Sequence, residues 1–374
     1  MKIAVLKERR AGDARVAATP ETVKKLIAQG HEIAIEADAG IMASIQDGDY
    51  EAEGAKICPD SKSTLSGANL VLGVRAPDDE TRKLLTKDQA LIGLLDPFAA
   101  KEEAADYAKS GVTAFAMEFV PRISRAQSMD ALSSQSNLGG YRAVIEASYL
   151  YGRAMPMMMT AAGTVAPAKT FVMGAGVAGL QAIATARRLG AVVSATDVRP
   201  AVKEQVASLG AKFIAVEDEE FKAAETAGGY AKQMSAEYQA KQAELVAKHI
   251  ANQDIVVTTA LIPGRPAPEL VTEDMVKSMR QGSVIIDMAA AQGGNCKLTK
   301  PDEVVEVHGV KIAGPTNLAN SISADASALY AKNLLAFIPL ITGENSELAP
   351  NWEDEIVSSS ALTRDGEIVH ESLK

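Results

Sequence analysis

Three glycines and one aspartate have a spacing that suits the binding of phosphates and a ribose. Gly174, Gly176 and Gly179 form a G-x-G-x-x-G pattern between an apolar run typical of a buried strand and a run typical of a helix. The first glycine permits a tight turn, the second lets the backbone approach a pyrophosphate, and the third lets helix and strand pack closely. The helix N-terminus then offers unpaired N–H groups and the positive end of its dipole to the phosphates.

Asp197 ends the next apolar run, about 20 residues downstream, where a ribose-binding carboxylate is expected. A carboxylate at this place accepts a hydrogen bond from a ribose 2′-OH and repels a 2′-phosphate. The sequence therefore predicts NAD rather than NADP as the nucleotide. Arg199 lies close by and weakens that preference only slightly.

A second polar group lies in residues 121–133, after a strand predicted over 113–117. This places it at the carboxyl edge of a sheet, where open α/β folds bind ligands. The loop carries two guanidinium groups, an amide and a carboxylate, from Arg122, Arg125, Gln127 and Asp130. These groups suit a carboxamide and phosphates, but none is a natural base near neutral pH. The competing interpretation is a solvated loop that caps the following helix.

Two further segments suit the walls of a nucleotide site. Residues 222–236 lie in a connection longer than a crossover needs, and they contain two adjacent glycines together with Tyr230 and Met234. This composition predicts a mobile loop that closes over a ligand, with an ordinary surface excursion as the alternative. Residues 259–264 follow a buried strand and place Leu261 against adenine or ribose, or else form a simple Pro-Gly turn.

Composition excludes several other classes of function. A formal charge of −10 over 374 residues argues against nucleic acid or an anionic membrane surface as the main partner. No apolar run is long enough for a transmembrane helix or a signal peptide, so a soluble chain is expected. The cysteines lack metal-ligand spacing, no metal site is predicted, and buried thiols in a reduced compartment are expected. The histidines are expected to be structural or solvated, and they are His31, His249, His308 and His370.

Strand-like and helix-like runs alternate along the chain, which predicts an α/β fold with two Rossmann-like, doubly wound parallel sheets and a cleft between them. The first set of strands is predicted at 2–6, 31–35, 70–74, 90–95 and 113–117. The second set begins at Thr170 and continues at 191–196, 212–216, 254–259, 283–287 and 310–313. The predicted domains are 1–136 with 320–374, and 137–319. A helix over 137–153 and another returning from about residue 320 make the two crossings.

Long matches give a resemblance to a known family. The chain resembles, over essentially its whole length, the NAD(H)-binding component, or domain I, of proton-translocating nicotinamide nucleotide transhydrogenase. The matching segments are 121–130, 133–137, 157–163, 195–199, 225–232 and 258–264.

The resemblance implies roles for individual residues. It implies that Arg122, Gln127 and Asp130 contact and orient the nicotinamide, and that Tyr230 belongs to the loop that closes over the nucleotide. The resemblance places three more residues beside the nicotinamide, namely Ser128, Met129 and Ser133. It assigns the adenosine half to Val177, Asp197, Val198, Arg199, Gly229, Gln242 and Leu261.

Alanine dehydrogenase, a relative with the same two-domain plan, is the alternative. This sequence keeps Arg15 and has Arg75 where that family uses a substrate-binding lysine. However, Asp96 stands in place of its catalytic histidine and Ala291 in place of its catalytic aspartate. Both losses remove groups that handle protons or bind amines, which decides against amino-acid oxidation. A non-catalytic NAD(H)-sensing module is the third interpretation.

Hydride transfer from one nicotinamide to another releases no proton, so it needs close contact of two rings and exclusion of water rather than a general base. Because the chain has one G-x-G-x-x-G, NADP(H) is expected on a partner component. The resemblance implies a membrane-spanning component that couples the reaction to proton translocation, a homodimer, and a place on the cytoplasmic face of the bacterial inner membrane, held through partners. The Met-rich stretch 155–159 is predicted to be core or a self-association surface.

Overall fold

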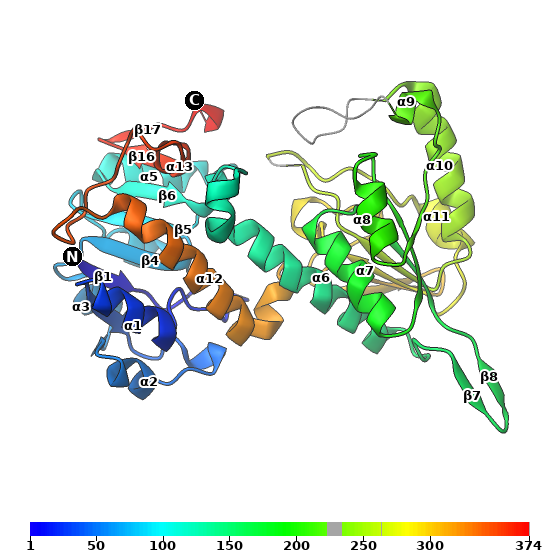
Figure 1. Cartoon of the computed structure of the whole chain (residues 1–374), viewed down its shortest axis with the longest axis horizontal. Helices are drawn as coiled ribbons and strands as arrows, with labels where there is room; N and C mark the ends of the chain where they lie inside the picture. The colour runs from blue at the N-terminus through cyan, green and yellow to red at the C-terminus, as the bar shows by residue number, and fades with distance from the viewer. Residues whose placement is uncertain (223–233, 263, 374) are drawn as a thin grey trace. The chain divides into compact units, whose positions relative to one another are not determined.

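The computed structural model describes residues 1–222, 234–262 and 264–373 (Figure 1). The chain divides into two compact units, each a sheet with helices on both faces. Unit 1 comprises Met1–Gln135 and Ala319–Lys374, and unit 2 comprises Ser136–Leu318. Helix α6 (Ala131–Leu150) contains the boundary between them.

Unit 1 is built on an eight-stranded sheet in the order β17-β16-β6-β5-β4-β1-β2-β3. The parallel strands are β1 (Lys2–Val5), β2 (Glu32–Glu36), β3 (Lys56–Cys58), β4 (Leu70–Arg75), β5 (Ala90–Leu94) and β6 (Thr113–Ala116). The antiparallel strands at one edge are β16 (Ala361–Arg364) and β17 (Glu367–Ile368). The helices are α1 (Pro20–Ala28), α2 (Asp47–Ala52), α3 (Ser61–Leu65), α4 (Asp79–Arg82), α5 (Lys101–Ser110), α12 (Ser323–Phe337) and α13 (Glu355–Ser360).

Unit 2 is built on a seven-stranded sheet in the order β11-β10-β9-β12-β13-β15-β14. Its strands are β9 (Lys169–Met173), β10 (Val192–Thr196), β11 (Lys212–Phe213), β12 (Ile255–Thr258), β13 (Val284–Asp287), β14 (Val304–Val307) and β15 (Val310–Ala313), of which β14 alone is antiparallel. Its helices, besides most of α6, are α7 (Val177–Arg188), α8 (Val202–Ser208), α9 (Glu219–Lys222), α10 (Ala236–Ile250) and α11 (Glu273–Ser278). A separate hairpin is formed by β7 (Met158–Thr160) and β8 (Gly163–Val165).

Short 3₁₀ turns connect several of these elements. They are η1 (Ile41–Ala43), η2 (Met117–Phe119), η3 (Ser124–Met129), η4 (Ala290–Gln292), η5 (Leu318–Ile322), η6 (Ile338–Ile341) and η7 (Glu371–Leu373).

The central strands are buried on both faces, as parallel sheets require. Because side chains alternate along a strand, Val172 of β9 packs with α6, α7 and α8, whereas Phe171 and Met173 pack with α10 and α11. In unit 1, Ile3 of β1 packs with α1 and α12, and Ala4 packs with α3 and α5. Each sheet thus separates two apolar layers, one on each of its faces.

The predicted fold class is confirmed. In both units the parallel strands take the order 3-2-1-4-5-6, which is that of doubly wound dinucleotide-binding folds. Every predicted strand is present, although β11 is shorter than the predicted 212–216. The six-strand expectation for the second sheet was incomplete, because β14 adds a seventh strand, and the first sheet gains β3, β16 and β17.

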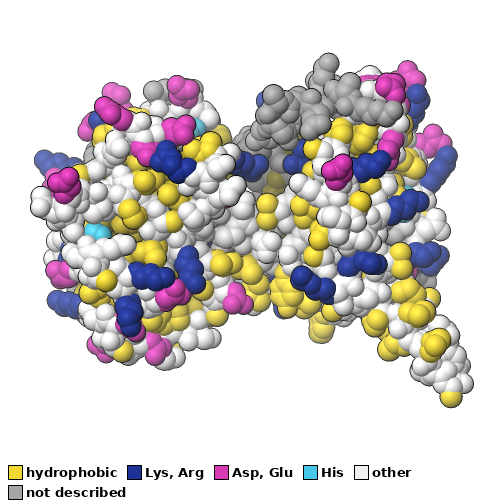
Figure 2. All heavy atoms as spheres, in the orientation of Figure 1, with side chains coloured by type: hydrophobic (Ala, Val, Ile, Leu, Met, Phe, Trp, Pro, Cys, Tyr) yellow, Lys and Arg dark blue, Asp and Glu magenta, His cyan; other side chains and the backbone are white. Residues whose placement is uncertain are grey.

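Two expectations on helices and core differ from the structure. Helix α6 begins at Ala131 rather than at residue 137, because Asp130 caps it by accepting the Ser133 N–H at 2.8 Å. The core interpretation of the Met-rich stretch is wrong for Met157, Met158 and Met159, whose exposures are 59%, 43% and 78%. These three residues lie at the start of the β7–β8 hairpin, which extends from unit 2 and carries hydrophobic atoms on its surface (Figures 1 and 2).

Candidate functional site

The glycine loop after β9 has a backbone that requires glycine at two of its three glycine positions. Gly174 has φ +103°, and a Cβ there would lie 2.5 Å from Thr259 Oγ1. A Cβ at Gly179 would lie 1.8 Å from the Gly174 carbonyl oxygen, so helix α7 packs directly on the loop. Around Gly176, by contrast, the nearest atom to such a Cβ is Arg199 Nη2 at 3.9 Å. Two glycines thus serve the turn and the packing, while the third leaves open space at the start of α7.

Asp197, at the end of β10, holds this loop in place. Its Oδ2 accepts the Ala175 N–H at 2.7 Å and Arg199 Nη2 at 2.9 Å, and its Oδ1 accepts the Arg199 N–H and Nε, each at 2.9 Å. The side chain is 6% exposed. Burial alone would raise the pKa of Asp197, but hydrogen bonds from Arg199 and Ala175 outweigh burial and hold the pKa below its ordinary value. Asp197 is therefore an ionised carboxylate at neutral pH.

Other residues expected around the adenosine half gather at the same edge of the unit 2 sheet. Gln242 of α10 donates to Thr196 Oγ1 at 3.1 Å and accepts the Val216 N–H at 2.9 Å, so it bridges the last residue of β10 and the segment that follows β11. Three apolar side chains that follow β9, β10 and β12 are exposed, namely Val177, Val198 and Leu261 at 41%, 62% and 50%. Gly229 and Tyr230, with most of the predicted mobile loop, lie outside the described residues.

Two polar residues that the sequence reasoning missed fix the neighbouring loops. Asp287, at the end of β13, accepts hydrogen bonds from Thr258 Oγ1, Thr299 Oγ1 and the N–H groups of Ala289 and Cys296. Asn295 is fully buried, and its amide bonds both backbone groups of Ala260 and the Pro268 carbonyl. The signal for Asp287 was in the sequence, since this carboxylate ends a buried strand as Asp197 does.

In unit 1, some polar groups of the loop after β6 form ion pairs and hydrogen bonds with other residues of the unit, and these contacts fix the loop. Arg125 forms a two-pronged ion pair with Asp354, at 2.6 and 2.9 Å, which ties the loop to α13. Asp130 accepts the Ser133 hydroxyl at 2.5 Å in addition to capping α6. Met129 is buried, with 6% of its surface exposed, and packs in the core. The helix-capping interpretation thus holds for Asp130 and Ser133.

Three groups of this loop remain for a ligand. Arg122, Gln127 and Ser128 are exposed. Arg122 has no hydrogen bond or ion pair with another described residue. Asn333 Nδ2 donates to the Ser128 carbonyl at 2.8 Å and so fixes the backbone beside Gln127.

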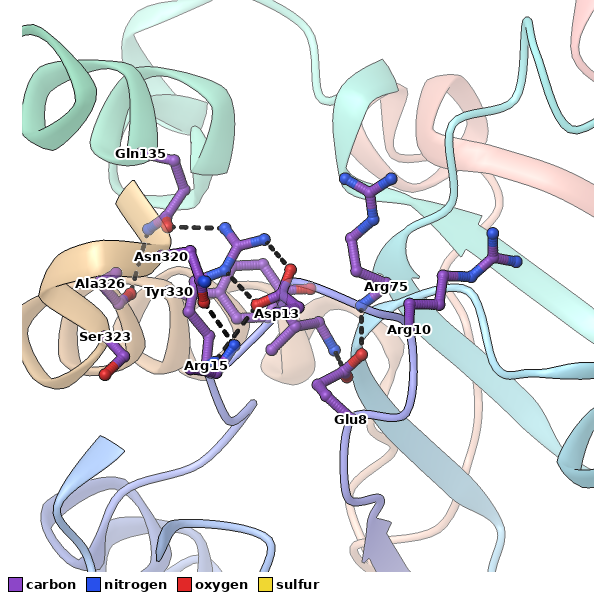
Figure 3. A network of polar contacts seen from close by, with 12 residues as sticks. Glu8, Arg10, Asp13, Arg15, Arg75, Gln135, Asn320, Ser323, Ala326 and Tyr330 are labelled. Carbon is purple, nitrogen blue, oxygen red and sulfur yellow. Dashed lines mark hydrogen bonds and ion pairs between the residues drawn. The ribbon is translucent and has the colours of Figure 1, made fainter. Parts of the chain in front are cut away.

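A buried polar network lies nearby in unit 1 (Figure 3). Arg15 is 3% exposed and is neutralised by Asp13, at 2.5 Å, while Gln135 Oε1 accepts its Nη1 at 2.9 Å. Glu8 accepts the N–H groups of Val74 and Arg75 at 2.5 and 3.3 Å, and its burial raises its pKa to about 7. The Arg75 side chain extends away from Glu8 (Figure 3).

The histidines have structural surroundings. His249 Nε2 lies 2.8 Å from Ser194 Oγ, and His308 Nε2 lies 3.1 Å from Glu273. His370 stacks on Phe119 with ring centroids 3.5 Å apart, and His31 is buried. Within the described part of the chain, no group of three or more His, Cys, Asp and Glu side chains is arranged to hold a metal ion.

Comparison with known proteins identifies the family that shares this architecture. The models of the "Alanine dehydrogenase/PNT" N-terminal and C-terminal domains match residues 4–139 and 143–371. The chain belongs to the alanine dehydrogenase/PNT family. An NAD(P) transhydrogenase subunit alpha polypeptide of Rhodospirillum rubrum is 55% identical over 380 residues, with 100% of this chain and 99% of that protein covered. The family resemblance inferred from the sequence is therefore confirmed.

Solved structures of this family have the same fold. The crystal structure of transhydrogenase from Sinorhizobium meliloti matches with a TM-score of 0.91 at 52% identity, covering 99% of this chain and 100% of that one. An L-alanine dehydrogenase matches with a TM-score of 0.83 at 26% identity, covering 100% and 98%. Among the described residues, no helix of this family member is both long and apolar enough to cross a membrane.

Proposed function

We propose that this chain is the NAD(H)-binding component of a proton-translocating transhydrogenase. Hydride passes directly between NADH bound here and NADP⁺ held by a partner component. The observation that carries the proposal is the glycine loop of unit 2, fixed by Asp197 through the Ala175 N–H and open around Gly176. The similarity to transhydrogenase alpha subunits over the whole chain supports it.

Different residues of unit 2 contact different parts of the nucleotide. The first turn of α7, after Gly176, binds the pyrophosphate, because its N–H groups and dipole favour negative charge. Asp197 accepts from the ribose hydroxyls, and Gln242 and Arg199 lie at the same edge of the sheet. The exposed side chains of Val198 and Leu261 offer apolar surface to the adenine.

The nicotinamide end is assigned to the unit 1 loop. Gln127 and Arg122 hydrogen-bond the carboxamide and set the angle of the ring, while Asp130 and Ser133 hold the loop to the start of α6. Ser128 is exposed beside the nicotinamide, Met129 anchors the loop in the core, and Tyr230 closes over the nucleotide. The hydride leaves C4 of NADH and bonds to C4 of NADP⁺ without releasing a proton, so these residues orient and exclude water rather than act as bases.

Amino-acid oxidation is disfavoured by the same structure. The resemblance to alanine dehydrogenase puts Asp96 and Ala291 where that enzyme handles protons and amines, and in the structure Arg15 is neutralised by Asp13. The Asp96 N–H donates to Glu118 at 2.7 Å, and Asp96 has φ +49°, so this residue serves the backbone turn after β5.

Partners complete the activity. A membrane-spanning component couples hydride transfer to proton translocation, and the chain sits on the cytoplasmic face of the bacterial inner membrane through its partners. The chain forms a homodimer, for which the exposed methionines of the β7–β8 hairpin are the candidate surface.

Mixing experiments test the proposal. The purified chain is combined with an NADP(H)-binding transhydrogenase component, and hydride exchange between NADH and an NADP⁺ analogue is followed by absorbance. Exchange only in the mixture supports the proposal, and no exchange in the mixture refutes it. NAD⁺ reduction by the chain alone with alanine supports amino-acid oxidation instead, and NADH binding without either reaction supports a sensing module.

A further inference from the structure

Two adjacent glycines, Gly139 and Gly140, lie in the middle of α6, outside every motif used so far. Glycine inside a helix lowers stability relative to alanine, because it loses more backbone freedom on folding. Neither residue has a positive φ, so the backbone conformation does not require glycine. The reason for the pair must lie in what the two positions contact.

The two glycines have different surroundings. A Cβ at Gly140 would lie 2.1 Å from the Ala178 carbonyl oxygen, 2.8 Å from its carbonyl carbon and 3.0 Å from its Cα. All three atoms are backbone, in the first turn of α7. A Cβ at Gly139 would meet only the tip of the Met288 side chain, at 3.1 Å, and Leu318 Cβ at 4.0 Å. A flexible methionine can move aside, whereas a helix backbone cannot move alone.

The first turn of α7 is therefore held on two sides by glycine contacts. Gly179 packs on the Gly174 carbonyl of the loop, and Gly140 packs on Ala178 from α6. Since contacts below 3.0 Å essentially do not occur for a real Cβ, a side chain at position 140 forces the helices apart by about 1 Å. That displacement acts at the N–H groups of α7.

We infer that Gly140 is a positioning residue for the nucleotide pyrophosphate. By letting α6 touch the backbone of Ala178, it sets where the first turn of α7 and its N–H groups stand. Displaced donors bind phosphates poorly, because charge-assisted hydrogen bonds depend on distance and direction. This inference rests on the proposed binding of NAD(H) at this helix.

Paired alanine variants of the two glycines test the inference. Gly140→Ala is compared with Gly139→Ala, which makes the same chemical change one residue earlier in the same helix. The dissociation constants of NADH, ADP and adenosine are measured by calorimetry for both variants and for the unaltered chain. We expect Gly140→Ala to weaken NADH and ADP by about tenfold or more and to leave adenosine, which lacks phosphates, within about twofold. Gly139→Ala should leave all three within about twofold.

Several results would overturn the inference. Equal NADH affinity in Gly140→Ala and the unaltered chain would remove the positioning role. A parallel loss for adenosine and ADP would indicate general distortion of unit 2, as would loss of the near-ultraviolet circular dichroism of Gly140→Ala. Failure of the unaltered chain to bind NADH would instead refute the proposed function, so the two ideas fail separately.

Discussion

Substitution of Asp197 by alanine tests the nucleotide site at its most specific point. The carboxylate accepts four hydrogen bonds, two from the Arg199 side chain and two from backbone N–H groups. These bonds account for about four lone-pair sites of a carboxylate. A ribose hydroxyl must therefore share a site or take the place of one arginine bond. Because the Arg199 side chain is 33% exposed, it can give way to the ribose.

The exchange of an arginine hydrogen bond for a ribose hydrogen bond determines how much NADH affinity the substitution costs. A hydrogen bond to a charged group contributes about 1.5–3 kcal/mol, and replacing one such bond by another returns only part of that amount. We therefore expect Asp197→Ala to weaken NADH by about 1–3 kcal/mol, or about 5- to 150-fold, with the lower half of that range favoured. NADPH should gain at the same time, because Arg199 is no longer held by the carboxylate and can pair with a 2′-phosphate.

Calorimetric titration of both nucleotides provides the measurement. Asp274→Ala is the matched control, since its carboxylate lies in the same unit but is 92% exposed on α11. The control should bind both nucleotides as the unaltered chain does. If Asp197→Ala keeps both the NADH affinity and the NADH-to-NADPH ratio, Asp197 has no part in the ribose site. A loss of NADH without any gain in the relative affinity for NADPH would refute the role given to Arg199.

Three further changes have defined outcomes. The folded-state pKa of Glu8, about 7, lies above its ordinary 4.5, so folding binds a proton between these values and the free energy of unfolding falls as pH rises from about 4.5 to about 7. Glu8→Gln should remove that part of the pH dependence of the free energy of unfolding, which urea titrations measure. The same pH dependence in the variant and in the unaltered chain would contradict this expectation. Gln127→Asn should slow hydride transfer about tenfold or more while NADH affinity changes less than about threefold, because ring orientation is lost; equal losses would contradict the orienting role. Met159→Asp should convert a dimer into monomers in sedimentation experiments, and an unchanged dimer would place the interface elsewhere.

Strong periodic patterns and motif spacing predicted much of the fold. Every strand that was expected exists, because buried parallel strands are continuous apolar runs. The missed strands are short or lie at edges. β14 and β15 form a hairpin around His308 and Gly309, both with positive φ, and two apolar runs separated by two residues were a usable signal. β17 has two residues, too few to show any period.

The candidate site was less predictable, because its supporting residues are chosen by three-dimensional neighbours. Arg125 is one of two arginines in the loop, and nothing local distinguishes it from Arg122. Only its approach to Asp354, more than 200 residues away in sequence, gives it a structural role. In the same way, the buried amide of Asn295 matters because Ala260 and Pro268 come beside it. The roles of residues that support a site can therefore be assigned only when the fold is known.

The shared fold of two different activities explains why individual side chains must decide the function. An L-alanine dehydrogenase superposes on the whole chain, so neither topology nor the glycine loop separates amino-acid oxidation from transhydrogenation. Amine oxidation must also move protons and therefore needs a base, whereas exchange of hydride between two nicotinamides does not. Four residues at the carboxyl edge of unit 1 suit such an exchange of hydride. Arg15 is neutralised by Asp13, Asp96 supports a backbone turn, and the exposed groups Arg122 and Gln127 can orient a carboxamide without acting as bases.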